Sequence, residues 1–182
     1  MNGSLLDLLQ AGGYILYAKH GEAIVGEDSP DLDFRYCCTQ RNLSELGRKQ
    51  AICYGQILVN LRVPINYPVL ASPFCRTIET AQLAFGRSNI QIDPFWFQVY
   101  RLGGNLSISE QRRIIDSIQS RLEVIPPQGC NRVIIAHSFP EGIGLGQIPD
   151  MGTAIVRPRG QGNGYEVVAK LSLTDLLNLE RY

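Results

Sequence analysis

The chain has 182 residues, of which 45% are hydrophobic, and its 17 basic residues balance 17 acidic ones. A chain of this length and ordinary composition is expected to fold as one domain over residues 1–182 with a sizeable core. The balanced charge provides no global field that would attract nucleic acid or an anionic membrane, so any recognition of anions must depend on local groups.

The N-terminal stretch LLDLLQAGGYILYA is apolar, but it resembles neither a signal peptide nor a membrane span. It lacks a basic leading region, contains Asp7 and is interrupted by Gly12-Gly13. We therefore expect a cytoplasmic protein.

The five cysteines are spaced irregularly, and none forms a Cys-x-x-Cys pair. Adjacent cysteines rarely bridge each other, and two histidines without such a pair make a poor zinc site. We therefore expect reduced thiols and no metal. The cysteines are Cys37, Cys38, Cys53, Cys75 and Cys130.

Apolar periodicity and turn residues divide the chain into alternating helices and strands. Two stretches show no clean period and are expected to be irregular: residues 21–42, a loop long enough to suggest a functional role, and the aromatic residues 93–105. In chain order the expected elements are a helix over 4–10, a strand over 14–18, a helix over 44–63, a strand over 68–71, a helix over 75–86, a strand over 90–92, a helix from 107 or 109 to 124, strands over 132–136, 154–157 and 165–171, and a helix over 174–180.

This alternation predicts an α/β fold with three layers, α/β/α, around a mainly parallel central sheet. Asn163-Gly164 lies between the last two strands and predicts a hairpin, so the sheet should have an antiparallel edge. In such folds, ligands bind at the carboxyl ends of the parallel strands.

Both histidines of the chain directly follow the end of an apolar strand. His20 ends the run YILYAKH, and His137 ends VIIAH. A third strand end, LASPFCR, leads into a helix whose first turn carries Arg76. Each feature alone has an ordinary explanation, a polar strand terminus or a solvated charge. If the strands are neighbours, however, two imidazoles, Arg76 and Lys19 converge at a helix N-terminus, which suits a phosphate.

Four motifs carry a family resemblance: YAKHGEA (residues 17–23), NLSELGRKQA (42–51), LASPFCRTIETA (70–81) and VIIAHS (133–138). In this order they resemble the motifs of the histidine phosphatase superfamily, the phosphoglycerate-mutase-like group. Its members carry Arg-His-Gly after the first strand, a Leu-(Ser/Thr)-x-x-Gly helix start, a Ser-Pro-x-x-Arg segment and a second histidine after a late strand. The resemblance covers residues 14–140 and implies a compact, phosphatase-type member with the phosphoglycerate-mutase-like fold.

The resemblance also implies roles for individual residues. His20 would be the nucleophile that forms a phosphohistidine, and Lys19, Arg76 and His137 would hold the phosphate oxygens. Gly21 would let the backbone approach the phosphate, and Arg41 would add a cation nearby. No metal or other cofactor is implied. The expected partner is a small phosphorylated substrate or a phosphohistidine protein, as in the compact bacterial members.

Two residues depart from the family pattern. Lys19 replaces the arginine that precedes the histidine, and an ammonium lacks the planar fork of donors. Gln98 stands where many members carry a glutamate that protonates the leaving group. Either another acid serves (Glu141, or Asp31 or Asp33 of the loop), or the substrate has a good leaving group, or activity is reduced.

The sequence therefore predicts a metal-independent phosphatase acting through a phosphohistidine on His20. The alternative is a catalytically impaired member of the same fold that binds a phosphate ligand, and a third possibility is an unrelated doubly wound domain. Adjacency of strands 14–18 and 133–136 separates the third possibility from the first two. Residues 22–40 and Phe95–Tyr100 are expected to shape the specificity pocket.

Overall fold

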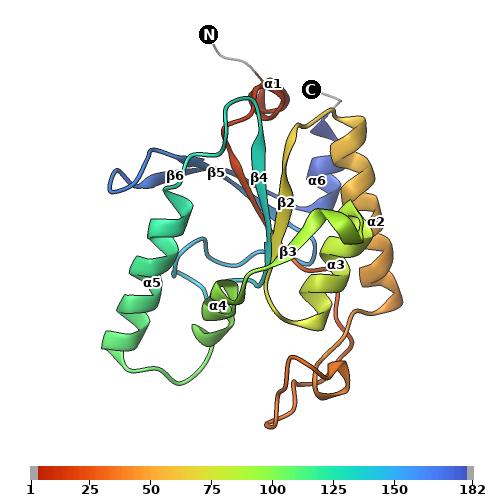
Figure 1. Ribbon diagram of the computed structural model, residues 1–182, viewed down its shortest axis with the longest axis vertical. Helices are drawn as coiled ribbons and strands as arrows, with labels where there is room; N and C mark the ends of the chain where they lie inside the picture. Colours follow the sequence, from red (N-terminus) through yellow and green to blue (C-terminus); the bar gives the residue numbers. More distant parts are fainter. Residues whose placement is uncertain (1–3, 180–182) are drawn as a thin grey trace.

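A six-stranded sheet runs through the centre of the molecule, with helices on both faces (Figure 1). The computed structural model describes residues 4–179. The strands are β1 Ile15–Lys19, β2 Ile65–Ala71, β3 Ile90–Ile92, β4 Asn131–Ala136, β5 Thr153–Pro158 and β6 Tyr165–Leu171. The helices are α1 Leu5–Ala11, α2 Glu45–Asn60, α3 Cys75–Phe85, α4 Phe97–Arg101, α5 Ile108–Leu122 and α6 Leu173–Leu177, with short 3₁₀ turns at Cys37–Thr39, Arg87–Asn89 and Pro94–Trp96.

The sheet has the order β3-β2-β4-β1-β5-β6. The first four strands in this order are parallel, whereas β5 and β6 are antiparallel to their neighbours. The mainly parallel sheet and its antiparallel edge are therefore confirmed. The strands predicted to carry the two histidines, β1 and β4, are direct parallel neighbours, with Lys19 opposite Ala136.

The two central strands are buried on both faces, which explains their continuous apolar runs. Leu16 and Ile135 pack with α1, α2, α3 and α6 on one face, whereas Tyr17 and Ile134 pack with α4 and α5 on the other. Burying each such side chain contributes about 1.5–3 kcal/mol, so the strand ends that carry the histidines are held rigidly. No helix of the described residues is long and apolar enough to cross a membrane.

Serine caps fix several helix starts where the sequence predicted them. Ser44 and Ser107 accept backbone N–H groups at the starts of α2 and α5. The short helix α4 was not predicted, because five residues show too little periodicity in an aromatic stretch. The predicted last helix reached residue 180, which lies outside the described residues.

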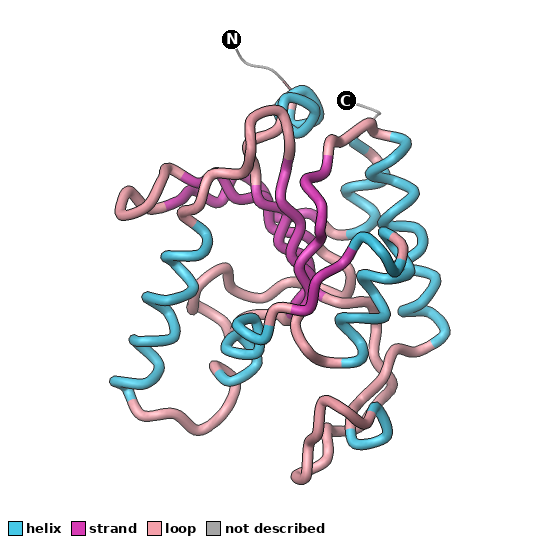
Figure 2. Tube along the Cα trace, viewed as in Figure 1, coloured by secondary structure: helices cyan, strands magenta, loops and turns pink. Residues whose placement is uncertain are grey.

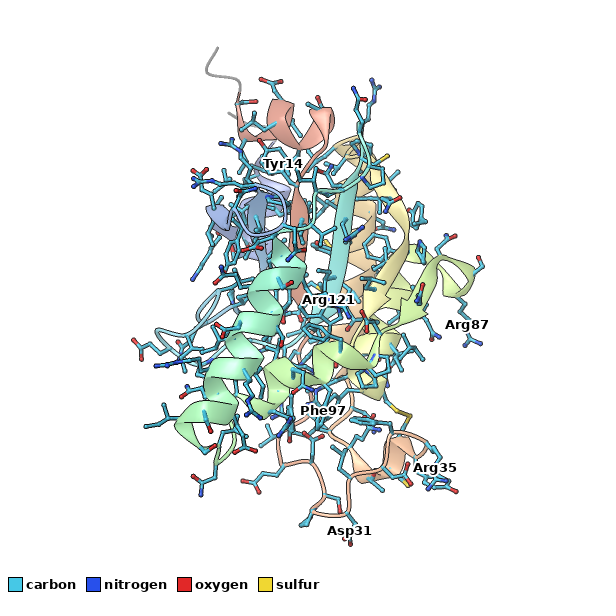
Figure 3. The ribbon with its side chains drawn as sticks, turned by 60° about the vertical axis from the view of Figure 1, so that its left-hand side comes forward. Tyr14, Asp31, Arg35, Arg87, Phe97 and Arg121 are labelled. Atoms are coloured by element: carbon cyan, nitrogen blue, oxygen red, sulfur yellow. A yellow bond between two sulfur atoms is a disulfide. The ribbon has the colours of Figure 1, made fainter. Side chains whose placement is uncertain are left out.

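The expectation of reduced thiols is wrong for two cysteines. Cys37 and Cys75 form a disulfide across 38 residues of sequence, while Cys38, Cys53 and Cys130 are unpaired (Figure 3). The pairing could not be predicted because it depends on how the irregular segment 22–42 folds back onto the start of α3. In Figure 2 this segment is mostly loop, and it extends below the carboxyl ends of the parallel strands.

Candidate active site

Three side chains meet at the carboxyl ends of β1, β2 and β4. The ring centroids of His20 and His137 lie 5.5 Å apart, and Arg76 Nε donates to His20 Nε2 at 3.2 Å. The three residues are called here the His–Arg cluster. They are brought together because the backbone N–H of His20 continues the sheet by donating to Ala136, next to His137.

The hydrogen bonds of His20 define its tautomer. Arg76 Nε can only donate, so Nε2 of the neutral ring accepts, and Nδ1 carries the proton that it donates to Gly21 O at 2.7 Å. Burial, followed by the charge of Arg76, lowers the pKa of His20 to about 3. His20 is therefore a neutral imidazole whose Nε2 is unprotonated, as a nucleophile requires, and accepts a hydrogen bond from the guanidinium of Arg76.

His137 is held by a hydroxyl and by aromatic rings. Its Nε2 lies 2.9 Å from Ser72 Oγ, and its ring packs edge-on against Phe74 and Tyr100. Burial lowers the pKa of His137 well below its ordinary value, followed by the repulsion that two protonated rings, His20 and His137, would exert on each other and by the charge of Arg76. The imidazole therefore offers hydrogen bonds without a fixed charge.

Arg76 makes a two-pronged ion pair that sequence reasoning missed. Its Nη1 and Nη2 donate to the two carboxylate oxygens of Asp28 at 2.8 and 3.1 Å. Asp28 also accepts from the backbone N–H of Arg41 and from the hydroxyl of Tyr100. Burial alone would raise the pKa of Asp28, but the hydrogen bonds from Arg76 and Arg41 outweigh it and lower the pKa. Asp28 is thus an ionised acceptor beside the cluster.

Segment 22–42 covers the cluster through contacts with three consecutive residues, 74–76. The contacts are Phe34 against Phe74 with ring centroids 5.0 Å apart, the Cys37–Cys75 disulfide, the Cys75 N–H donating to Gln40 Oε1 at 2.8 Å, the Asp28–Arg76 pair, and Arg76 Nη1 donating to Arg41 O at 3.1 Å. As a result, His20, Arg76 and His137 are only 4–5% exposed.

A cavity of about 630 Å³ has His137 in its lining, whereas His20 and Arg76 do not line it. Its walls come from α4, the glycine-rich residues that follow α4, and the loop after β4, including Phe97, Tyr100 and Phe139. Phe97 lies on α4 directly above segment 22–42 in Figure 3, and its ring contacts that of Phe34. Phe97, Val99 and Tyr100 of the segment expected to shape the specificity pocket line this cavity, whereas no residue of 22–40 does; the specificity role stays a prediction.

Solved structures of phosphatases share this architecture. The protein histidine phosphatase SixA in complex with tungstate is 16% identical, and the match covers 90% of this chain and 99% of that chain with a TM-score of 0.54. Phosphoserine phosphatase from Entamoeba histolytica in complex with 3-phosphoglyceric acid is also 16% identical, covering 90% and 98% with a TM-score of 0.54. This chain has the histidine phosphatase fold.

A protein from Mycobacterium tuberculosis, the open reading frame Rv3214, has the same fold, with 19% identity, coverage of 86% of this chain and 96% of that chain, and a TM-score of 0.58. No protein-family model and no curated protein sequence matches the chain. At these identities the likeness establishes the histidine phosphatase fold, whereas the chemistry depends on this chain's own residues.

Two predicted site residues at the end of β1, Lys19 and Gly21, contact other segments of the protein. Lys19 forms an ion pair with Asp150 at 2.6 Å, so its ammonium is anchored by a carboxylate that the sequence did not single out. At Gly21, a Cβ atom would collide with the carbonyl of Gly47 in α2. The absence of a side chain at residue 21 is therefore explained by close packing of the strand end against α2.

The remaining predicted residues divide between the cluster and its surroundings. Arg41 lies beside Asp28, and its Nε is buried without a hydrogen-bond partner among the described residues. Gln98 accepts from Arg101 at 3.0 Å. Glu141 is exposed on the loop after β4, and no hydrogen bond of the described residues joins it to the His–Arg cluster.

Ser72 and Asp28 were missed for different reasons. Ser72 directly follows β2, so the same argument about strand ends that singled out the histidines could have found it. Asp28 is one of several acidic residues in an irregular segment, and nothing in the pattern separates it from Asp31 or Asp33, which the sequence offered instead. Asp33 pairs locally with Arg35.

Removal of the disulfide is expected to loosen segment 22–42. Cys37→Ser should lower the free energy of unfolding by about 2–4 kcal/mol, because the bond closes a long loop in the unfolded chain. It should also speed amide hydrogen exchange in residues 22–42, which urea unfolding and exchange measurements would detect. Cys38→Ser is the matched control, because Cys38 is exposed and unpaired. Equal behaviour of the two variants would contradict the covering role of the disulfide.

The stability of the protein is expected to fall as the pH is lowered from about 7 to about 5. The pKa of His20 is 6.5 in the unfolded chain but about 3 in the fold, so the unfolded state binds more protons below the unfolded pKa. Each such histidine contributes a slope of about 1.4 kcal/mol per pH unit between its two pKa values. Urea unfolding at several pH values would measure the slope, and His20→Asn should reduce it. An unchanged slope in the variant would show that His20 is not buried as a neutral ring.

Proposed function

We propose that the chain is a metal-independent phosphatase that hydrolyses a phosphomonoester or a phosphohistidine through a phosphohistidine intermediate on His20. The observation that carries the proposal is the contact between Arg76 Nε and the Nε2 of a neutral His20. The contact supports the proposal because an unprotonated imidazole and a guanidinium lie together, so that a phosphoryl group bound beside them would contact both.

The reaction proceeds in two steps. The Nε2 lone pair of His20 attacks phosphorus, the bond to the leaving group breaks, and water later attacks the phosphohistidine to release phosphate. Arg76 and the unpartnered Nε of Arg41 supply positive charge to the phosphate oxygens, and His137 supplies a hydrogen bond. These side chains perform the charge stabilisation for which other phosphatases use metal ions.

The names of similar structures suggest the class of substrate. SixA is a protein histidine phosphatase, and the Entamoeba histolytica enzyme is a phosphoserine phosphatase. We extend to this chain only what these proteins share, a phosphoryl group transferred from a small molecule or a side chain. The cytoplasmic location stays a prediction. The Cys37–Cys75 disulfide does not favour it, because disulfides persist mainly in oxidising compartments.

Hydrolysis of p-nitrophenyl phosphate in the presence of EDTA tests the proposal. Wild type is expected to turn over this substrate at the same rate with and without EDTA. Loss of turnover on chelation, or no turnover under either condition, would refute a metal-independent phosphatase.

A second candidate is a phosphate-binding protein of the same fold without catalytic competence. It is favoured by two ion pairs, Lys19 with Asp150 and Arg76 with Asp28, which engage cations that the proposed reaction requires. Lys19→Arg separates the candidates. Phosphate binding without turnover in both wild type and the variant supports the binding protein, whereas a large gain in turnover by the variant supports an enzyme weakened at residue 19.

A further inference from the structure

The cavity beside His137 has the size and lining of a site for an organic group. It encloses about 630 Å³, within the range of small-molecule sites. Aromatic rings from two elements form its walls, and the rings of Phe97 and Tyr100 are stacked at 5.9 Å with an angle of 22° between them. The Tyr100 ring also packs edge-on against His137 at 5.6 Å. His137 lines the cavity and its ring centroid lies 5.5 Å from that of His20, so a flat ring on a phosphate ester bound between the two imidazoles would meet aromatic surfaces.

The cavity also carries one fixed charge. Among the described residues that line it, Arg101 is the only one with a permanent charge, and no carboxylate lines it. Gln98, which occupies the position of the family's acid, accepts a hydrogen bond from Arg101 Nη1 at 3.0 Å and so orients the guanidinium. Because Gln98 is an amide in place of an acid, a neutral side chain holds the Arg101 cation at the apolar cavity. Such a cation favours an anionic substituent on the bound group.

The environment of the cluster limits which leaving groups can depart. Asp28 is the carboxylate that contacts the His–Arg cluster in the described part of the chain, and it accepts four hydrogen bonds. With its oxygens engaged by Arg76, Arg41 and Tyr100, it acts as an acceptor and not as a proton donor. An alkoxide, which is comparable in basicity to hydroxide, needs a donor, whereas a phenolate, whose conjugate acid has a far lower pKa of about 10, departs without one.

We propose that the cavity binds the leaving group of an aryl phosphate whose ring carries an anionic substituent. The proposal rests on the proposed phosphatase function and names its substrate class. His20 Nε2 forms the bond to phosphorus while the aryl P–O bond breaks, and its electron pair departs with the phenolate. Water then forms a P–O bond, the P–N pair returns to Nε2, and the proton of the water passes to the solvent.

Four phosphate esters and one matched pair of variants test this assignment. The substrates are phenyl phosphate, 4-(carboxymethyl)phenyl phosphate, cyclohexyl phosphate and phosphoserine, and kcat/KM is measured for each. Wild type is expected to prefer the carboxymethyl ester over phenyl phosphate by about tenfold, the scale of one charge-assisted contact. Both aryl esters should exceed cyclohexyl phosphate, which has a similar size but an alkoxide leaving group, by at least about 100-fold.

Arg101→Gln should bring the ratio of kcat/KM for the two aryl esters close to one, mainly by raising KM for the carboxymethyl ester. Arg112→Gln, which removes an exposed arginine of α5 outside the cavity, should keep the wild-type ratio.

Two results would overturn the assignment while leaving the proposed function intact. One is equal turnover of cyclohexyl and phenyl phosphate, and the other is faster turnover of phosphoserine than of either aryl ester. An absence of turnover with every ester, including p-nitrophenyl phosphate, would instead refute the phosphatase function itself.

Discussion

His20→Asn is expected to lower kcat for p-nitrophenyl phosphate by at least about 10³-fold, because the variant removes the atom that forms the bond to phosphorus. Asparagine is polar and smaller than histidine. Gly21 and Arg76 therefore lose the imidazole as a hydrogen-bond partner, but no charge is introduced beside them. Steady-state kinetics with the same substrate would measure the loss.

The loss must come from chemistry and not from unfolding. Circular dichroism and urea unfolding of His20→Asn at about pH 7 should show a folded protein, because a buried neutral ring is exchanged for a neutral amide. Retention of more than about a tenth of wild-type kcat in a folded variant would show that another group attacks phosphorus.

Arg76→Lys is expected to lower kcat by about 10²–10³-fold, the cost of losing one well-placed donor to a developing oxyanion. Arg76 uses three nitrogens at once: Nε toward His20, and Nη1 and Nη2 toward Asp28. An ammonium cannot reproduce this planar arrangement, so either His20 or Asp28 loses its partner. The effect should appear in kcat more than in KM, because the planar guanidinium is best matched to the equatorial oxygens over which charge is spread in the transition state.

Arg48→Lys is the matched control for this substitution. Arg48 lies on α2 and pairs with Glu79 at 2.7 Å, away from the His–Arg cluster. Its replacement should change kcat by less than about twofold, as expected for a partly exposed ion pair. Similar losses in the two variants would mean that the arginine at position 76 acts through general stability and not at the phosphate.

The parts of the fold that follow from local pattern were predictable. β1 and β4 were predicted correctly because strands that are buried on both faces have continuous apolar sequences. The carboxyl ends of the two strands lie at the same edge of the sheet because neighbouring strands of such a sheet are parallel. The juxtaposition of His20 and His137 depends only on these two strands being neighbours, so the sequence contained enough information to expect it.

The parts that depend on long-range contacts were not predictable. The Cys37–Cys75 disulfide and the Asp28–Arg76 ion pair both require segment 22–42 to fold back onto α3, and no periodic pattern describes that segment. The pairing of Lys19 with Asp150 likewise joins the last residue of β1 to the loop that precedes β5. These contacts determine the electrostatics of the cluster, and sequence alone indicated only which residue types were available.

The most direct test of the central claim is to trap the covalent intermediate. Wild type mixed with radiolabelled substrate, quenched in alkali within its first turnover and digested, is expected to yield one labelled peptide with the phosphoryl group on His20. His20→Asn should yield none. A label on His137 or another residue, or turnover by wild type without any covalent label, would contradict a mechanism through phosphohistidine at His20.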